Sequence, residues 1–286
     1  MDFTRKESEV LEEIKRLQSS FPNLHFHGSH PSVSTGSLIP GCEICIRSNH
    51  RAYISFPLGY HCNAKCPFCF VYAYKTDTPD KRKEEEHIRK SFLNEFQHHK
   101  DKIEGVAFTG GEPLLYLPEL KACIFEIKKA KSGLHFWIYT NGIIADDEHL
   151  GVLKDLGIQE IRFNLAATDY SKEVLKYLKR ARDMFKWVAV EVPSYPKQKD
   201  KLIECLEELN RIGIDQLTLQ ELLVTDINVH NLEKEGFREG YQSGIQLGLM
   251  SSTKFFLYGS RKMTYEIMKY CVDKKHSFTV NDCSSR

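Results

Sequence analysis

Three cysteines, Cys62, Cys66 and Cys69, lie close together in the stretch CNAKCPFC. Thiolate sulfur binds zinc and iron–sulfur clusters, so this trio indicates a metal centre. In a [4Fe–4S] cluster three thiolates would leave the fourth iron open to a non-protein ligand, which is what chemistry at a metal requires. In a structural zinc site a fourth protein ligand, such as His61 or Cys45, would close the coordination shell. The spacing alone leaves both alternatives open.

Alternating apolar strands and helices follow one another along the middle of the chain. We expect six strands, at 52–58, 105–109, 134–140, 160–166, 186–193 and 215–222, with helices between them. This rhythm is typical of β–α–β units and predicts a parallel sheet covered by helices. Six units are too few for a closed eight-unit barrel and suit an open doubly wound sheet or a partial barrel.

Residues suited to chemistry follow the first three of these strands. The cysteine trio comes after the first strand, TGGEP (109–113) after the second, and TNG (140–142) ends the third. Ligands of parallel α/β proteins bind beyond the carboxyl ends of the strands. We therefore expect these three motifs to share one functional edge of the sheet.

The segments outside the strands divide the chain into three parts. Residues 1–51 are expected to form an N-terminal helix, which a capping box of Thr4 and Glu7 would start, and an irregular cysteine-containing loop. Residues 52–222 form the core, and 223–286 a C-terminal extension that closes the barrel. Within this extension, the glycines of 240–250 predict a helix and loop.

Composition excludes several classes of protein. The chain has 40 Lys+Arg against 39 Asp+Glu, so no strong field indicates nucleic acid as a partner. No apolar run is long enough to span a membrane, and the N-terminus does not resemble a signal peptide. We expect the protein to lie in the cytoplasm, where thiols stay reduced. In that compartment its nine cysteines indicate metal or redox chemistry more than disulfides.

CNAKCPFC, with the aromatic Phe68 before its last cysteine, resembles the signature of the radical S-adenosylmethionine (SAM) superfamily, and TGGEP resembles that family's GGE motif. The resemblance implies an α/β fold, a (β/α)6 partial TIM barrel, with an N-terminal helix and loop extension and a short C-terminal extension. It implies that the trio holds a [4Fe–4S] cluster. It also implies that Gly110, Gly111 and Glu112 hold the amino group of SAM, since glycines allow close approach and a carboxylate complements an amine.

The same resemblance implies a function. Members pass one electron to SAM from a low-potential donor such as flavodoxin or ferredoxin, and the 5′-deoxyadenosyl radical then abstracts hydrogen from a substrate. Here the substrate is unidentified: a biosynthetic or maturation reaction on a small metabolite, peptide or nucleoside, or alternatively activation of a glycyl-radical enzyme. No catalytic residue is assigned. The alternative of another class is a zinc-stabilised α/β binding module, against which GGEP counts because zinc does not need it.

Polar residues on later strands are further candidates for the SAM site. In the family such residues contact the ribose and the carboxylate of SAM, which assigns this role to Thr140, Asn141 and Asn164. Arg162 alternates with Asn164 on the fourth strand and would face the same way. The alternative is a structural pair, in which Arg162 bonds Glu191 or Glu221.

Four outer cysteines, two before the trio and two after the core, are candidate ligands of a second metal site. GCEIC before the trio and VNDCSSR after the core resemble a poorly characterised subgroup related to pyruvate formate-lyase activating enzymes, a likeness that covers most of the chain. It implies that Cys42, Cys45, Cys271 and Cys283 bind a second [4Fe–4S] cluster, although zinc would satisfy the same thiolates. Cys123 and Cys205, each alone in an amphipathic helix, are interpreted as buried core residues.

Overall fold

A computed structural model of the chain describes residues 1–28, 30, 32–47, 52–71, 73, 78–247 and 250–283, with the backbone alone at 245–247 and 250–253. Two compact units result. The central unit comprises Ile39–Lys65 and Val71–Ala189, and the terminal unit comprises Met1–Leu38, Cys66–Phe70 and Val190–Arg286.

The central unit is built on parallel strands in chain order: β4 (Tyr53–Pro57), β5 (Gly105–Thr109), β6 (His135–Thr140) and β7 (Glu160–Phe163). Both faces of these strands are covered, and Val106, Phe108 and Ile138 have no exposed surface. Burial on both faces is why these strands appear in the sequence as continuous apolar runs. The next strand, β8 (Trp187–Pro193), begins in the central unit and ends in the terminal one.

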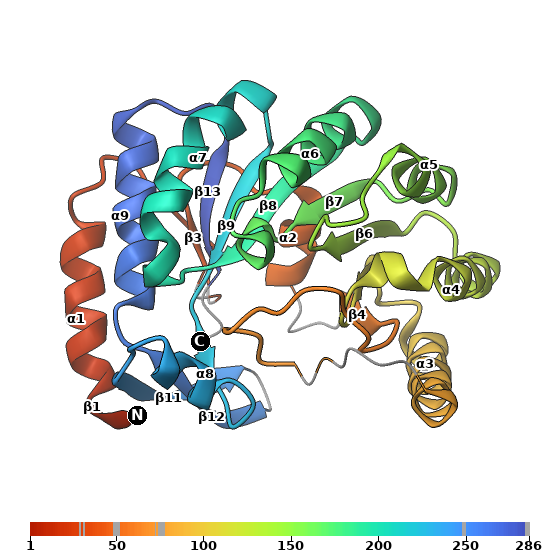
Figure 1. Ribbon diagram of the computed structural model, residues 1–286, viewed down its shortest axis with the longest axis horizontal. Coiled ribbons are helices and arrows are strands. Elements are labelled where there is room, and N and C mark those ends of the chain that lie inside the picture. Colours follow the sequence, from red (N-terminus) through yellow and green to blue (C-terminus); the bar gives the residue numbers. More distant parts are fainter. Residues whose placement is uncertain are drawn as a thin grey trace. The chain divides into compact units, whose positions relative to one another are not determined.

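Helices fill the connections between the strands of the central unit (Figure 1). They are α3 (Pro79–His99), α4 (Leu117–Ala130), α5 (Asp147–Asp155) and α6 (Lys172–Met184), with 3-10 helices at Pro113–Tyr116 and Leu165–Thr168. Polar side chains of Thr78, Asp146 and Ser171 cap the starts of α3, α5 and α6.

The short helix α2 (Pro40–Ile46) packs on the sheet face opposite α4. Its Ile44 lies beside Gly105 on β5, whereas Lys128 of α4 lies over the ring of Phe136, on the other face of β6. The sequence predicted an irregular cysteine-containing loop within residues 1–51, and this was wrong for α2. The reason is that Pro40 supplies a helix start that needs no main-chain donor.

The terminal unit contains a second group of strands around β9 (Gln216–Gln220). β13 (Thr279–Cys283) pairs with β9 in parallel and with β3 (Val33–Ser34) in antiparallel, and β3 pairs with β2 (His25–Phe26). The helices here are α7 (Lys199–Ile212), α9 (Ser260–Asp273) and a 3-10 helix at Pro196–Gln198. The C-terminal extension thus contributes a parallel strand, which sequence reasoning missed.

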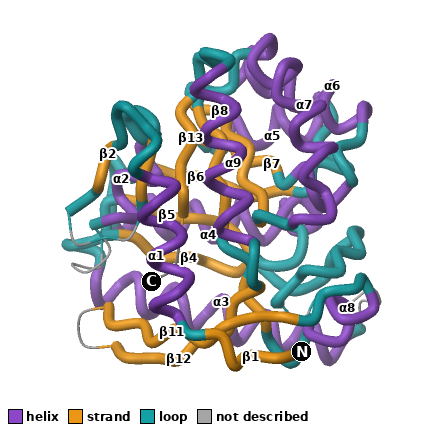
Figure 2. The backbone as a smooth tube through the Cα atoms, turned by 90° about the vertical axis from the view of Figure 1, so that its left-hand side faces the viewer, coloured by secondary structure: helices purple, strands orange, loops and turns teal. Residues whose placement is uncertain are grey.

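A separate sheet of four strands lies in the terminal unit, in the order β1 (Asp2–Arg5), β11 (Glu239–Leu247), β12 (Met250–Leu257) and β10 (Leu223–Val224) (Figure 2). The helix α8 (Val229–Lys234) precedes β11. The helix predicted over 240–250 is wrong where the structure describes it, because residues 240–247 pair in antiparallel with β12, and residues 248–249 lie outside the described residues. A Cβ at Gly244 would meet nothing within 4 Å, and a glycine at such an open position is tolerated in a strand.

Helix α1 (Glu7–Gln18) lies beside α9 in both views. Val10 and Ile14 are its buried residues. The predicted capping box is wrong: Thr4 belongs to β1, and Lys6 precedes the helix without a side-chain cap. The Gln18 amide donates to the Tyr265 hydroxyl at 2.6 Å, which fixes the end of α1 to α9.

The predicted fold class is confirmed. All six expected strands are present as β4 to β9, the fold is α/β with parallel strands, and the sheet stays open as a partial barrel. The division at residues 51 and 222 stays a prediction. No helix in the described ranges combines the length and apolar character needed to cross a membrane.

Candidate cofactor site

Helix α3 anchors the loop that leads from β4 to the first cysteine of the trio. A guanidinium nitrogen of Arg89 donates to the carbonyl of Leu58 at 2.6 Å, and the Tyr60 N–H donates to a carboxylate oxygen of Glu85 at 2.6 Å. Glu85 is 3% exposed, a rare environment for a carboxylate without partners of this kind. Sequence reasoning assigned no role to this acidic residue in a charged helix.

Tyr116 holds the same loop from a second direction. Its hydroxyl donates to Glu85 at 2.9 Å and accepts the N–H of His61 at 2.8 Å. A Cβ at Gly59 would lie 2.3 Å from the Tyr116 ring, so the loop packs directly on that ring. The sequence offers no signal for this contact, because a tyrosine among leucines is typical of core.

The two glycines of TGGEP interlock with the backbone of this loop. The Gly111 N–H donates to the Gly59 carbonyl at 2.8 Å, and the Glu112 N–H to the His61 carbonyl at 2.9 Å. A Cβ at Gly110 would lie 2.1 Å from the Gly59 oxygen, and one at Gly111 would lie 2.3 Å from the His61 oxygen. These glycines therefore bring the second motif against the chain just ahead of Cys62.

Glu112 joins the end of β5 to the end of β6. It is 1% exposed and accepts from the Thr140 hydroxyl at 2.8 Å, the Asn141 N–H at 2.7 Å and the Leu114 N–H at 3.1 Å. Burial raises the pKa of Glu112 to about 7, against the lowering effect of the donors from Asn141 and Thr140. The predicted neighbours Glu112, Thr140 and Asn141 are thus brought together.

The raised pKa of Glu112 predicts a pH-dependent stability. Its unfolded pKa is 4.5 and its folded pKa about 7, so its favourable contribution is complete below 4.5 and is lost as pH rises through 7. This gap corresponds to about 3 kcal/mol. We expect Glu112→Gln to flatten the fall in unfolding free energy of the metal-free protein between pH 5 and 8, measured by denaturant titration. Parallel curves for the variant and the wild type would contradict this.

The side chain of Asn141 reaches the first cysteine. Its Nδ2 lies 3.8 Å from the Cys62 sulfur and donates to Asn63 Oδ1 at 2.7 Å, while its Oδ1 accepts the Ile143 N–H at 2.9 Å. The Ala64 N–H also donates to the Cys62 sulfur, at 3.4 Å. Three motifs from consecutive strands therefore meet around Cys62 in the central unit.

Cys66 and Cys69 belong to the terminal unit, in a turn where the Cys69 N–H donates to the Cys66 carbonyl at 3.2 Å. Phe68 between them is held by the Asn228 side-chain amide on its carbonyl at 3.0 Å and by the Tyr195 ring, 5.3 Å away between centroids. Among the described residues, no three His, Cys, Asp or Glu side chains are grouped as metal ligands. The trio as a ligand set stays a prediction.

Asn164, a predicted SAM ligand, lies just beyond the end of β7. Its side-chain oxygen accepts the Ala167 N–H at 3.3 Å and so caps the 3-10 helix that follows. The residue is half-buried. Its capping bond leaves the amide nitrogen to act elsewhere, and its role toward SAM stays a prediction.

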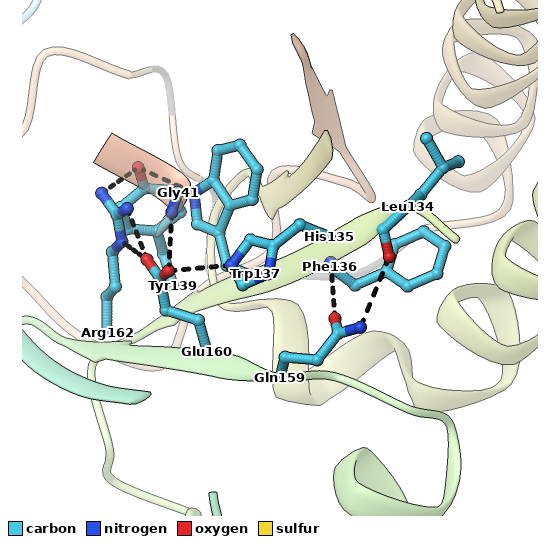
Figure 3. Close-up of polar contacts among 9 residues, drawn as sticks. All are labelled: Gly41, Leu134, His135, Phe136, Trp137, Tyr139, Gln159, Glu160 and Arg162. Carbon is cyan, nitrogen blue, oxygen red and sulfur yellow. Dashed lines mark hydrogen bonds and ion pairs between the residues drawn. The ribbon is translucent and has the colours of Figure 1, made fainter. Parts of the chain in front are cut away.

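Arg162 pairs with a residue on its own strand (Figure 3). Its Nε donates to Glu160 at 2.6 Å, a partner that the sequence analysis did not consider, and a pairing with Glu191 or Glu221 stays a prediction. His135 Nε2 lies 2.9 Å from the same fully buried carboxylate. Burial raises the pKa of Glu160, but Arg162 and His135 outweigh it and hold that pKa below its ordinary value.

The same carboxylate fixes helix α2. The Gly41 N–H donates to Glu160 at 2.9 Å, and a Cβ at Gly41 would lie 2.5 Å from Arg162 (Figure 3). A side chain at position 41 would therefore displace the ends of the Arg162 and Glu160 side chains. Cys42 is buried and Cys45 half-buried on this helix.

The other outer cysteines belong to the terminal unit. Cys271 lies inside α9, and burial raises the pKa of its thiol to about 12. Cys283 is half-buried at the end of β13. The four-cysteine site stays a prediction. Cys123 and Cys205 are buried, as their interpretation as core residues requires.

Glu191 and Glu221, considered above as possible partners of Arg162, have hydrogen-bond partners within the terminal unit. Glu191 accepts from the Gln220 amide at 2.5 Å, and Glu221 accepts from the Tyr241 hydroxyl. These contacts favour the structural reading of both residues.

The donor set around Cys62 fits a [4Fe–4S] cluster. Two N–H groups on the sulfur stabilise the negative charge of a thiolate ligand. The loop before it is fixed by the side chains of Arg89, Glu85 and Tyr116 and by two main-chain bonds from the GGE turn. The GGE turn is hydrogen-bonded to the loop ahead of Cys62 and carries the buried carboxylate of Glu112, a group that suits an amine such as that of SAM. The residues present therefore suit both groups.

Comparison with known proteins agrees with the resemblance to the radical SAM superfamily. A sequence model of the radical SAM superfamily matches residues 56–234. A protein of Methanocaldococcus jannaschii, named as a candidate glycyl-radical enzyme activating enzyme, is 27% identical over 214 residues, which are 69% of this chain and 53% of that protein. This chain thus spans about half the length of that relative.

Solved structures share the fold. SuiB of Streptococcus suis bound to SAM matches with a TM-score of 0.56 and 13% identity, over 98% of this chain and 61% of SuiB. Coproporphyrinogen III oxidase of Escherichia coli, a radical SAM enzyme, matches with a TM-score of 0.53 and 12% identity, over 83% of this chain and 56% of the oxidase. At such identities the likeness concerns the fold alone.

Proposed function

The chain belongs to the radical SAM superfamily, since the family model covers residues 56–234 of its 286, and we propose from this that it is a radical SAM enzyme whose cluster ligands are Cys62, Cys66 and Cys69. When bound, the reduced [4Fe–4S] cluster and SAM supply a 5′-deoxyadenosyl radical that abstracts hydrogen from a substrate. A low-potential donor such as ferredoxin or flavodoxin would provide the electron, and the reducing cytoplasm is the compartment we propose.

The chain's own residues would bind SAM and fix its orientation. An ionised carboxylate offers about four acceptor positions, and Glu112 uses three of them on Thr140, Leu114 and Asn141. The remaining position suits the amino group of SAM. Thr140 and Asn141 fix that carboxylate from the end of β6, and Asn164 would complete the SAM site.

One observation carries this proposal: the GGE turn and the loop ahead of Cys62 share two main-chain hydrogen bonds, from Gly111 to Gly59 and from Glu112 to His61. A structural zinc site does not need a second motif fixed so closely to its first ligand. A cluster whose open iron is chelated by SAM does need it, because the SAM-binding residues must lie at a fixed distance from the metal.

The first experiment is anaerobic. The protein is reconstituted with iron and sulfide, SAM and dithionite are added, and nucleoside products are measured by mass spectrometry. We expect 5′-deoxyadenosine. Methylthioadenosine instead would show that a different carbon–sulfur bond breaks. Neither product, with zinc as the sole bound metal, would contradict the proposal and support a zinc-stabilised binding module.

For the substrate we propose a biosynthetic or maturation reaction on a small metabolite, peptide or nucleoside. The similarity to the Methanocaldococcus jannaschii protein favours a second candidate, activation of a glycyl-radical enzyme. The number of clusters helps to separate the two, because an additional cluster favours maturation. About eight irons per chain, falling to about four in Cys42→Ala, would support the first candidate. About four in both proteins would support the second.

A further inference from the structure

The orientation of the Asn141 amide is fixed by its neighbours. Its Oδ1 accepts the Ile143 N–H at 2.9 Å, and an N–H can be met only by the oxygen of an amide. The nitrogen must therefore face the other way, toward Asn63 Oδ1 at 2.7 Å and the Cys62 sulfur at 3.8 Å. Hydrogen-bond networks of this kind decide between the two settings of an amide.

The amide is also held rigidly. Asn141 is 6% exposed, and its own N–H donates to the buried carboxylate of Glu112 at 2.7 Å. Both hydrogens of Nδ2 are used, one on Asn63 and one on Cys62, so this nitrogen has none left for SAM. Its position suits an action on the sulfur better than contact with a ligand.

We propose that Asn141 is a positioning residue that donates a hydrogen bond to the Cys62 sulfur and thereby raises the reduction potential of the cluster. The inference rests on the proposed function. Hydrogen bonds to ligand sulfurs stabilise the added negative charge of the reduced state and are among the factors that set cluster potentials. Together with the Ala64 N–H at 3.4 Å, the amide gives this sulfur two donors.

Asn141→Asp separates this role from a structural one. Aspartate keeps an oxygen for the Ile143 N–H and so keeps the turn, but an ionised carboxylate cannot donate to sulfur. The matched control is Asn63→Asp, which adds the same charge on the exposed neighbour that is bonded to Asn141. Both proteins are reconstituted anaerobically, their iron and sulfide are measured, and midpoint potentials are determined by electron paramagnetic resonance titration.

We expect Asn141→Asp to shift the midpoint potential to more negative values, or to lose iron, while Asn63→Asp stays close to the wild type. A second variant, Asn141→Ala, removes the donor without adding charge and should shift the potential in the same direction. Equal potentials and iron contents for Asn141→Asp and Asn63→Asp would overturn the proposal. Failure of the wild type to bind iron or to cleave SAM would instead contradict the proposed function, so the two results are distinguishable.

Discussion

Cys62→Ala is expected to abolish formation of 5′-deoxyadenosine and to prevent assembly of the cluster. With one of three ligands lost, a second iron loses its protein ligand and the cube has too few thiolates to hold it. The loop itself should stay in place, because its anchors on Arg89, Glu85 and Tyr116 do not involve the sulfur. Iron content, visible absorption and nucleoside products measure the outcome.

Cys205→Ala is the matched control for this loss. Cys205 is buried in α7, burial raises the pKa of its thiol to about 12, and it belongs to no proposed ligand set. Its replacement should reduce stability modestly and leave iron and product at wild-type levels. Full iron and product in Cys62→Ala, or their loss in Cys205→Ala, would mean that the ligands are assigned to the wrong cysteines.

Gly111→Ala is expected to separate the GGE turn from the cysteine loop. The new Cβ would lie 2.3 Å from the His61 carbonyl oxygen, a backbone atom that cannot rotate away. Forcing the two segments apart should cost about 2–3 kcal/mol of unfolding free energy. It should also break the Gly111 and Glu112 hydrogen bonds, so SAM cleavage should fall by more than the loss of stability explains.

Gly151→Ala tests whether the effect belongs to the site. Gly151 lies inside α5, and a Cβ there would meet nothing within 4 Å. Alanine in a helix is favoured over glycine by about 1 kcal/mol, so this variant should be slightly more stable and fully active. Denaturant titration and product formation compare the two variants. A Gly111→Ala protein as stable and active as Gly151→Ala would contradict the interlock.

The sequence located most strands and helices because local patterns of apolar and turn residues decide where these elements begin and end. β5 was predicted over the residues it occupies, since GVAFT is a buried apolar run bounded by turn residues. β13 was missed because TVNDC has an interior of Asn and Asp, and it becomes a strand only by pairing with β9. The hairpin of β11 and β12 was missed for the same reason: its glycines suggested a loop, and the partner strand decides the outcome.

The sequence predicted the motifs of the site but not the contacts that connect them. CNAKCPFC and TGGEP mark the residues that the proposed cofactors require, and their positions after successive strands place them together. The sequence could not show that Gly110 and Gly111 face a neighbouring loop, nor that Glu85 and Tyr116 hold that loop. Such contacts join residues from separate elements and leave no periodic trace in the chain.

The composition of the two units has a consequence for how the chain folds during synthesis. No residue beyond Ala189 belongs to the central unit, whereas the terminal unit pairs β1 with β11 and β3 with β13, across almost the whole sequence. Closing such long loops is slow relative to local pairing. The central unit should therefore fold first on the ribosome. Residues 1–38 can pair with their partner strands only after residues 190–286 have been synthesised. Protease protection of nascent chains halted before β11, present over β5 to β7 and absent over α1, would show this order.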